Sequence, residues 1–105
     1  MKSKEFWYAV YFKRIAAAIY GRWATCVDEA ILNQKVRDKT STLFRIIMDK
    51  DGKIQEILTV KSSGREDLDE CGRQAFLGNR SFPNPPVDLI EADHKIRINW
   101  VMTVK

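Results

Sequence analysis

Two carboxylates lie close together in the run Asp49-Lys50-Asp51-Gly52. Paired carboxylates can act as general acid and base, or can hold a hard cation. A calcium loop that begins at Asp49 requires a glutamate near position 60, where Val60 stands instead. No nucleophile with a partnered base accompanies the run, so catalysis is not expected. Asp and Gly in this order are typical of a turn, because Asp bonds to the local backbone and Gly accepts a positive φ.

The sequence has two cysteines, Cys26 and Cys71, and a single histidine, His94. Neither cysteine belongs to a CxxC pair, and His94 lies far from both in the sequence, so a zinc site is not expected. Two buried thiols and a disulfide both remain open. A disulfide between Cys26 and Cys71 would stabilise the fold by about 3–4 kcal/mol through the unfolded state. His94 is expected in an exposed loop without a role, and no cofactor is expected.

Length and composition indicate one soluble globular domain over residues 1–105, with 45% hydrophobic and 30% charged residues. The net charge of +4 comes from residues 1–40, which carry eight Lys and Arg against four Asp and Glu. So modest an excess is better explained by the solvated face of a helix than by a nucleic-acid patch. No run of about 18 apolar residues occurs, so no membrane-spanning segment is predicted in this stretch.

The C-terminal stretch 95–104 predicts a strand with one buried face. Its apolar residues alternate strictly, and successive side chains of a strand point to opposite sides. The residues predicted to face the core are Ile96, Ile98, Trp100, Met102 and Val104, and those predicted on the other face are Arg97, Asn99, Val101 and Thr103.

Two helices and a hairpin precede this strand. Apolar residues at three- and four-residue steps predict helices over 6–24 and 66–78, and residues 28–34 could extend the helical structure. Gly21 could bend or fray the first helix. The turn at Asp51-Gly52 predicts a hairpin over 42–61. Its second strand has a mixed apolar phase, which either a bulge near Gln55-Glu56 or a partly covered second face would reconcile.

The predicted order is therefore α-β-β-α-β, an α+β fold with a small three-stranded antiparallel sheet and two helices on one face. The terminal strand can join the hairpin only at an outer side, so two sheet edges stay open, and one of them is expected to belong to the terminal strand. An open edge can receive an extended peptide as an additional strand.

The chain resembles the TonB/TolA C-terminal domains over roughly residues 6–104. The shared pattern begins with a helix that contains Tyr11-Phe12-Lys13-Arg14-Ile15, Ile19 and Trp23. It continues with the Asp51-Gly52 turn, a strand that ends in Ser62-Ser63-Gly64, a helix opened by Leu68-Asp69, and the connector Phe82-Pro83-Asn84-Pro85-Pro86 before an alternating strand.

The resemblance implies a non-enzymatic periplasmic domain of a Gram-negative bacterium, at the end of a protein anchored in the inner membrane. Such a domain works with an ion-driven motor complex through its upstream part. It pairs its terminal strand with the TonB box, an extended segment of outer-membrane TonB-dependent receptors. The residues that this role implies for partner binding are Ile96, Arg97, Ile98, Asn99, Trp100, Val101, Met102 and Thr103. Trp100 is nevertheless expected to pack its ring in the core, since it shares the parity of Ile96 and Ile98.

Other readings stay open. A TolA-like envelope-integrity adaptor would bind a Tol-system partner, and the long first helix with Trp23 is closer to that group. TolA domains often join their first strand to their second helix by a disulfide, whereas Cys26 precedes the first strand here. A small nucleic-acid-binding module is less favoured, because it would need exposed aromatic residues on the sheet. A homodimer through the open sheet edges is a further alternative.

Overall fold

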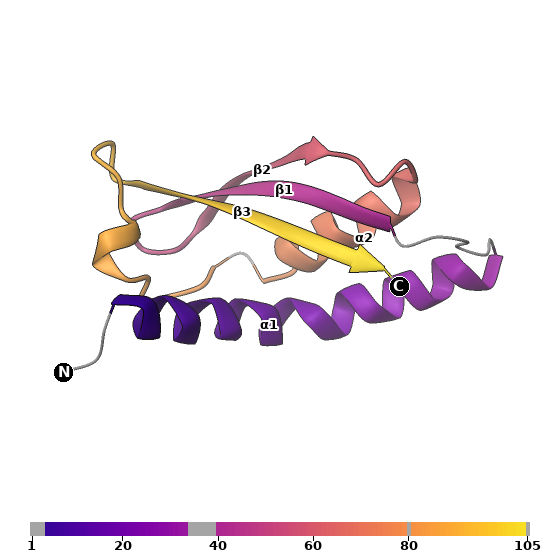
Figure 1. Ribbon diagram of the computed structural model, residues 1–105, viewed down its shortest axis with the longest axis horizontal. Coiled ribbons are helices and arrows are strands. Elements are labelled where there is room, and N and C mark those ends of the chain that lie inside the picture. Colours follow the sequence, from indigo (N-terminus) through magenta and orange to yellow (C-terminus); the bar gives the residue numbers. More distant parts are fainter. Residues whose placement is uncertain (1–3, 34–39, 80, 105) are drawn as a thin grey trace.

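The computed structural model describes residues 4–33, 40–79 and 81–104 of the chain. Figure 1 shows a layer of strands lying over a layer of helices. The elements are helix α1 (Lys4–Asn33), strands β1 (Thr40–Asp49) and β2 (Ile54–Lys61), helix α2 (Glu66–Leu77), the short 3-10 helix η1 (Val87–Leu89) and strand β3 (Lys95–Val104). The predicted α+β class and the order α-β-β-α-β are confirmed.

The first helix is longer than the sequence pattern predicts. It continues from residue 24 to Asn33 without a break, and Gly21 does not interrupt it. Residue 34, the end of the predicted extension, lies outside the described residues. The added turns persist because Val27 is buried against Leu68 and Val104, in a small cluster separate from the main core. Tertiary packing of this kind stabilises a helix end more than intrinsic propensity does.

The sheet has the order β2-β1-β3, with β1 antiparallel to both neighbours. The pairing of β1 with β2 skips Gln55, so Met48 faces Ile54 while Ile47 faces Glu56. The predicted bulge is therefore present. It turns both Ile54 and Ile57 toward the helices and leaves Leu58 and Val60 on exposed positions.

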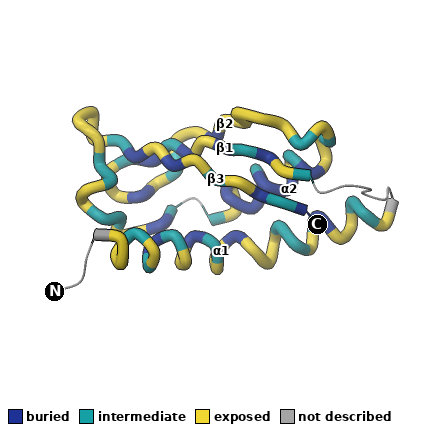
Figure 2. Tube along the Cα trace, viewed as in Figure 1, coloured by how far each residue is buried: buried dark blue, intermediate teal, exposed yellow. Residues whose placement is uncertain are grey.

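The core lies between the sheet and the two helices. Figure 2 shows buried residues where these layers face each other, with exposed residues outside. Its fully buried members come from every layer, including Tyr11, Phe44, Phe76 and Ile96. Phe76 packs edge-on against Phe44 at 6.3 Å between ring centroids. Tyr11 Oη donates a hydrogen bond to the carbonyl oxygen of Phe82 at 2.6 Å and so ties α1 to the connector after α2.

Candidate partner-binding edge

Strand β3 forms one edge of the sheet. It pairs with β1 over its whole length, from Thr40 opposite Val104 to Asp49 opposite Lys95, without a register shift. Figure 1 shows β3 running in the same direction as α1 beneath it. Among the described residues, no other strand lies on the far side of β3.

The hairpin determines which backbone groups of β3 face this open side. Asp49 donates its N–H to Lys53 and accepts a hydrogen bond from Gly52, so its backbone groups point toward β2. Its cross-strand partner Lys95 therefore directs its own groups away from β1, because hydrogen-bonded and non-bonded pairs alternate in an antiparallel ladder. Consistent with this direction, the carbonyl oxygen of Lys95 accepts a hydrogen bond from the N–H of Glu91 at 2.8 Å.

The same alternation continues along the strand. The backbone groups of Arg97, Asn99, Val101 and Thr103 face the open edge, and those of the residues between them bond to β1. In the described part of the chain, no loop or side chain donates to or accepts from these outward groups. The open edge of β3 thus presents a row of N–H and C=O groups from four residues, all unpaired within the described structure.

The side chains of these four residues lie on the sheet face opposite the helices. Arg97 pairs with Glu91 and, at 2.8 Å, with Asp93. These hydrogen bonds raise the pKa of Arg97 and lower the pKa of Asp93, so both groups stay charged. Asn99 accepts a hydrogen bond from Arg45 Nε at 3.2 Å, and Thr103 bonds to Ser41 at 3.0 Å. Val101 is 59% exposed.

The other predicted site residues differ in what they can offer. The side chains of Ile96 and Ile98 are buried in the core, that of Met102 is largely buried but lines a cavity between β3 and α1, and the backbone groups of all three residues face β1. Trp100 is half-buried, with its ring 5.8 Å from that of Phe76. The predicted core position of the Trp100 ring is therefore largely met, and this residue also lines the cavity between β3 and α1.

A groove runs between this edge and α1, which the sequence pattern did not predict. A cavity of about 190 Å³ lies there, lined by Ala16, Ile19, Tyr20, Trp23, Trp100, Val101, Met102 and Thr103. A neighbouring cavity of about 460 Å³ continues it toward Val104 and Asp28. In the sequence, the groove could have been suspected from Tyr20, a large aromatic residue placed off the apolar stripe of α1. In the structure, Tyr20 is 63% exposed.

The opposite edge of the sheet is partly occupied. Arg73 of α2 donates from Nη1 to the carbonyl oxygen of Ile57 and from Nη2 to Thr59 Oγ1, both at 3.0 Å. The backbone groups of Ile46 bond to β3, so its partner Ile57 in β2 directs its own carbonyl group outward. The same alternation of bonded and non-bonded pairs applies to β3. The two edges are therefore not equivalent as docking sites.

The residues considered for chemistry have local roles. Asp49 Oδ1 accepts hydrogen bonds from the N–H groups of Asp51 and Lys53, the turn-forming role expected for it. His94 is exposed, with a φ of 64°. The described residues contain no group of three His, Cys, Asp or Glu that could hold a metal ion.

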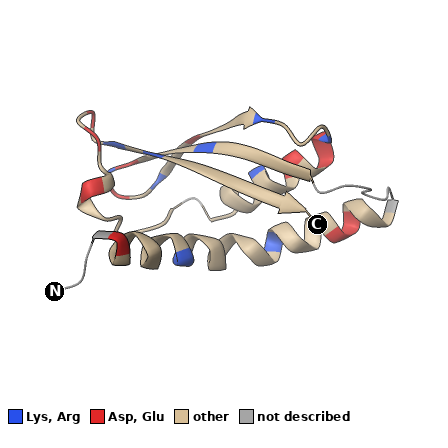
Figure 3. Cartoon of the chain, viewed as in Figure 1, with Lys and Arg blue, Asp and Glu red and all other residues tan. Residues whose placement is uncertain are grey.

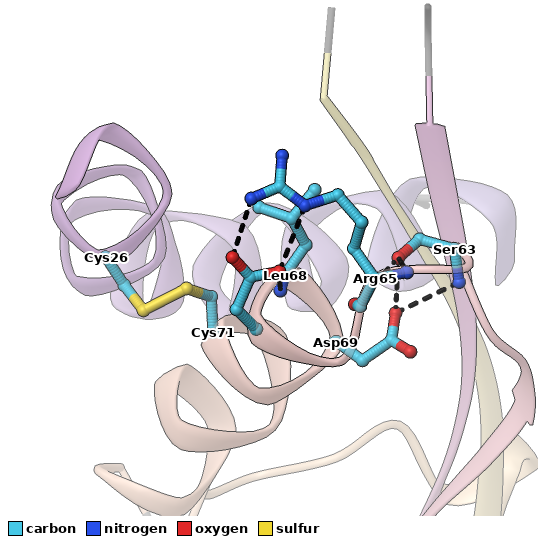
Figure 4. Close-up of polar contacts among 7 residues, drawn as sticks. Cys26, Ser63, Arg65, Leu68, Asp69 and Cys71 are labelled. Atoms are coloured by element: carbon cyan, nitrogen blue, oxygen red, sulfur yellow. Dashed lines mark hydrogen bonds and ion pairs between the residues drawn. A yellow bond between two sulfur atoms is a disulfide. The ribbon is translucent and has the colours of Figure 1, made fainter. Parts of the chain in front are cut away.

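Cys26 and Cys71 form a disulfide that joins α1 to α2, with their Cα atoms 5.5 Å apart (Figure 4). Of the two alternatives, the described structure has the bridge. It joins two helices, and not the first strand and the second helix, which is the arrangement that the resemblance to TolA domains implies.

Comparison with known proteins gives one match. A family model described as TonB C terminal matches residues 8–99. No curated protein and no solved structure matches the chain. None of the described helices combines the length and the apolar character that crossing a bilayer demands.

Proposed function

The chain belongs to the TonB C-terminal family, and from this premise we propose that the open edge of β3 binds an extended segment of an outer-membrane receptor. Domains of this family are non-enzymatic protein-interaction domains of energy transduction across the cell envelope. The receptor segment would add a fourth strand beside Arg97, Asn99, Val101 and Thr103. The observation that carries this proposal is the outward direction of their backbone groups.

Strand addition alone would give weak binding. Four outward-facing residues carry four N–H and four C=O groups, so pairing along the whole row would make up to about eight new hydrogen bonds at a net ~1 kcal/mol each. The loss of translational and rotational freedom on association consumes most of this gain. Side-chain contacts must therefore supply affinity and specificity, and Val101 with its exposed side chain is the first candidate on the outer face.

Membership of the family implies a periplasmic, envelope-associated protein. We propose further that a part of the protein upstream of this domain reaches the inner membrane and its ion-driven motor complex. In that arrangement, a pull on α1 would be transmitted to β3 through the core that the two elements share. Tyr11, Ile15 and Ile19 of α1 are buried in the same cluster as Ile96 and Ile98.

In the alternative role, a Tol-system partner would use the same edge. The length of α1, 30 residues, supports this alternative, because a long first helix is closer to the TolA group. The nucleic-acid alternative has less support. The aromatic residues of the three strands are Phe44 and Trp100, and both lie on the helix-facing side of the sheet. Stacking of bases on the outer face would require aromatic rings there.

Hydrogen exchange tests the pairing residue by residue. In the free domain, the amides of Arg97, Asn99, Val101 and Thr103 should exchange faster than those of Ile98 and Trp100. Addition of a synthetic peptide with a receptor N-terminal segment should protect the fast set and leave the slow set unchanged. Protection elsewhere, with the fast set still exchanging, would contradict the proposal. Peptides from Tol-system proteins and single-stranded oligonucleotides at low and moderate salt form the comparison arms.

A matched pair of proline variants provides the second test. Val101→Pro removes an outward N–H and fixes φ, so it should abolish peptide binding. Thr59→Pro makes the same change on the outer edge of β2 and should leave binding intact, because edge strands tolerate proline at outward positions. Unchanged affinity of a folded Val101→Pro variant would show that the partner does not pair with β3.

A further inference from the structure

The groove between α1 and β3 adjoins the edge that the proposed partner would use. Half of its eight lining residues belong to the edge strand β3 and half to α1: Trp100, Val101, Met102 and Thr103 of β3, and Ala16, Ile19, Tyr20 and Trp23 of α1. The groove is therefore continuous with the row of outward backbone groups on β3. A strand paired with that row would cover the groove.

Strand geometry decides which part of the partner would enter. A paired strand lies about 4.8 Å beyond β3, and its side chains alternate between the two faces of the sheet. Every second side chain would point toward the helix layer, as Trp100 and Met102 do in β3 itself. On the α1 side the cavity is lined by the small residue Ala16 and by the rings of Tyr20 and Trp23, which pack against each other with their centroids 5.9 Å apart.

The lining determines the chemistry of the occupant. None of the eight residues that line the cavity carries a charge, and three of them are aromatic. Figure 3 shows the C-terminal half of β3 free of charged residues. The cavity volume of about 190 Å³ suits one large side chain rather than a small molecule. A charged side chain would lose its hydration there without gaining a partner.

We propose that the partner segment carries an apolar anchor, a branched aliphatic or aromatic residue, that enters the cavity between the packed Tyr20 and Trp23 rings of α1 and Trp100 of β3 as the segment pairs with β3. This inference rests on the proposed strand addition and states its specificity. The residues on either side of the anchor face outward, beside Asn99 and Val101, and are free to be polar. The recognised class is thus an extended segment with alternating apolar and polar residues and one obligatory large apolar position.

A library of random ten-residue peptides tests the pattern without assuming a sequence. Peptides that bind the wild-type domain should share one large apolar residue flanked by polar residues at the neighbouring positions. Replacement of that residue by Ala in one selected peptide should weaken binding about 10- to 100-fold, which corresponds to the burial of one large apolar side chain. Selected peptides without such a position would overturn the inference.

Variants of the domain locate the anchor. Ala16→Leu fills the groove and should weaken binding of the selected peptide about as much as replacement of the peptide's anchor by Ala does. When the Ala16→Leu domain is combined with the anchor-less peptide, the two losses of affinity should not add. Ala17→Leu is the matched control, because Ala17 is exposed on the same helix and does not line the groove. Tyr20→Ala removes one wall at an exposed position and should also weaken binding. Equal effects of Ala16→Leu and Ala17→Leu would contradict the anchor site.

The two proposals fail in distinguishable ways. Loss of binding in Val101→Pro together with unchanged binding in Ala16→Leu and Tyr20→Ala would support strand addition and overturn the anchor. Unchanged binding in Val101→Pro with loss in Ala16→Leu would overturn strand addition, and with it the stated geometry of the anchor. A domain that selects no peptide from the library would overturn both.

Discussion

Arg73 Nη1 donates a hydrogen bond to the carbonyl oxygen of Ile57, and this contact makes the two edges of the sheet different. The guanidinium lies along the outer side of β2, where a second Nη2 bond reaches Thr59. From Arg97 to Thr103, the edge of β3 has no such cover among the described residues. Edge strands with unpaired backbone groups promote association of sheets, so a cover on one of them limits pairing to the other.

Arg73→Ala should expose the second edge. We expect a loss of about 1 kcal/mol in the free energy of unfolding, since Arg73 is partly solvated and its bonds are screened. We also expect stronger self-association, measured by light scattering over a concentration series. Gln74→Ala, on an exposed position of the same helix, is the control. A monomeric Arg73→Ala variant at all concentrations would show that the contact does not protect the edge.

Tyr11→Phe should destabilise the domain by about 1–3 kcal/mol at neutral pH, because it leaves the Phe82 carbonyl without its hydrogen bond in a buried position. Burial also raises the pKa of Tyr11 to about 12, against a smaller opposing effect of Arg14. The folded state therefore holds the proton more tightly than the unfolded state. This contribution is present below about pH 10, the ordinary tyrosine value, and is lost as the pH rises through about 12.

Urea unfolding at pH 7 and at several values up to pH 11.5 checks this prediction. The wild type should lose stability relative to Tyr11→Phe over the alkaline range, so that the difference between them narrows. Tyr20→Phe alters a tyrosine that is largely exposed and should behave like the wild type. A constant difference between wild type and Tyr11→Phe across the range would refute the linkage.

Asp69→Asn should weaken the junction between β2 and α2. Asp69 accepts hydrogen bonds from Ser62 and from Thr42 Oγ1 at 2.7 Å. It also accepts from the N–H and Oγ of Ser63, as Figure 4 shows. Burial raises the pKa of Asp69, but these hydrogen bonds outweigh it and hold the pKa below the ordinary value. Loss of the charge should cost about 1–3 kcal/mol at pH 7.

The pH dependence has the opposite sign to that of Tyr11. A carboxyl group with a lowered folded pKa stabilises the fold above its unfolded pKa of about 3.9, and this stabilisation is lost as the pH falls through the folded pKa. Thermal unfolding from pH 7 to pH 2 should therefore show the wild type and Asp69→Asn converging in acid. Glu66→Gln removes an exposed charge from the same helical turn and should change little. Parallel curves would argue against the role of these hydrogen bonds.

Reduction of the Cys26–Cys71 disulfide should lower the free energy of unfolding by about 4 kcal/mol, since the bridge closes a loop between residues 45 apart in sequence. The C-terminal turns of α1 should lose hydrogen-exchange protection first, because Val27 is held there beside Cys71. Thermal unfolding with and without reductant measures the effect. The Cys26→Ser/Cys71→Ser variant should unfold at the same temperature as the reduced wild type, with or without reductant. An equal unfolding midpoint for oxidised and reduced wild type would contradict the prediction.

Local sequence determined the elements and their buried faces. The period of two from Ile96 to Val104 is sufficient to predict β3 and its core-facing side, because alternate side chains of a strand must lie on opposite faces. Asp49 and Gly52 likewise specify the turn, through side-chain bonds to the backbone and a φ of 86° at Gly52. Both signals act within a few residues, so they can be read without knowledge of the rest of the chain.

Tertiary structure decided everything that depends on contacts between distant residues. The central position of β1, the cover that Arg73 provides for Ile57, and the pairing of Cys26 with Cys71 each join segments with no local relation in the sequence. The extra turns of α1 are stabilised because Val27 packs in a hydrophobic cluster with residues of α2 and β3. The groove arises in the same way, since Ala16 and Tyr20 form a cavity only when packing brings the side of α1 beside the open edge of β3.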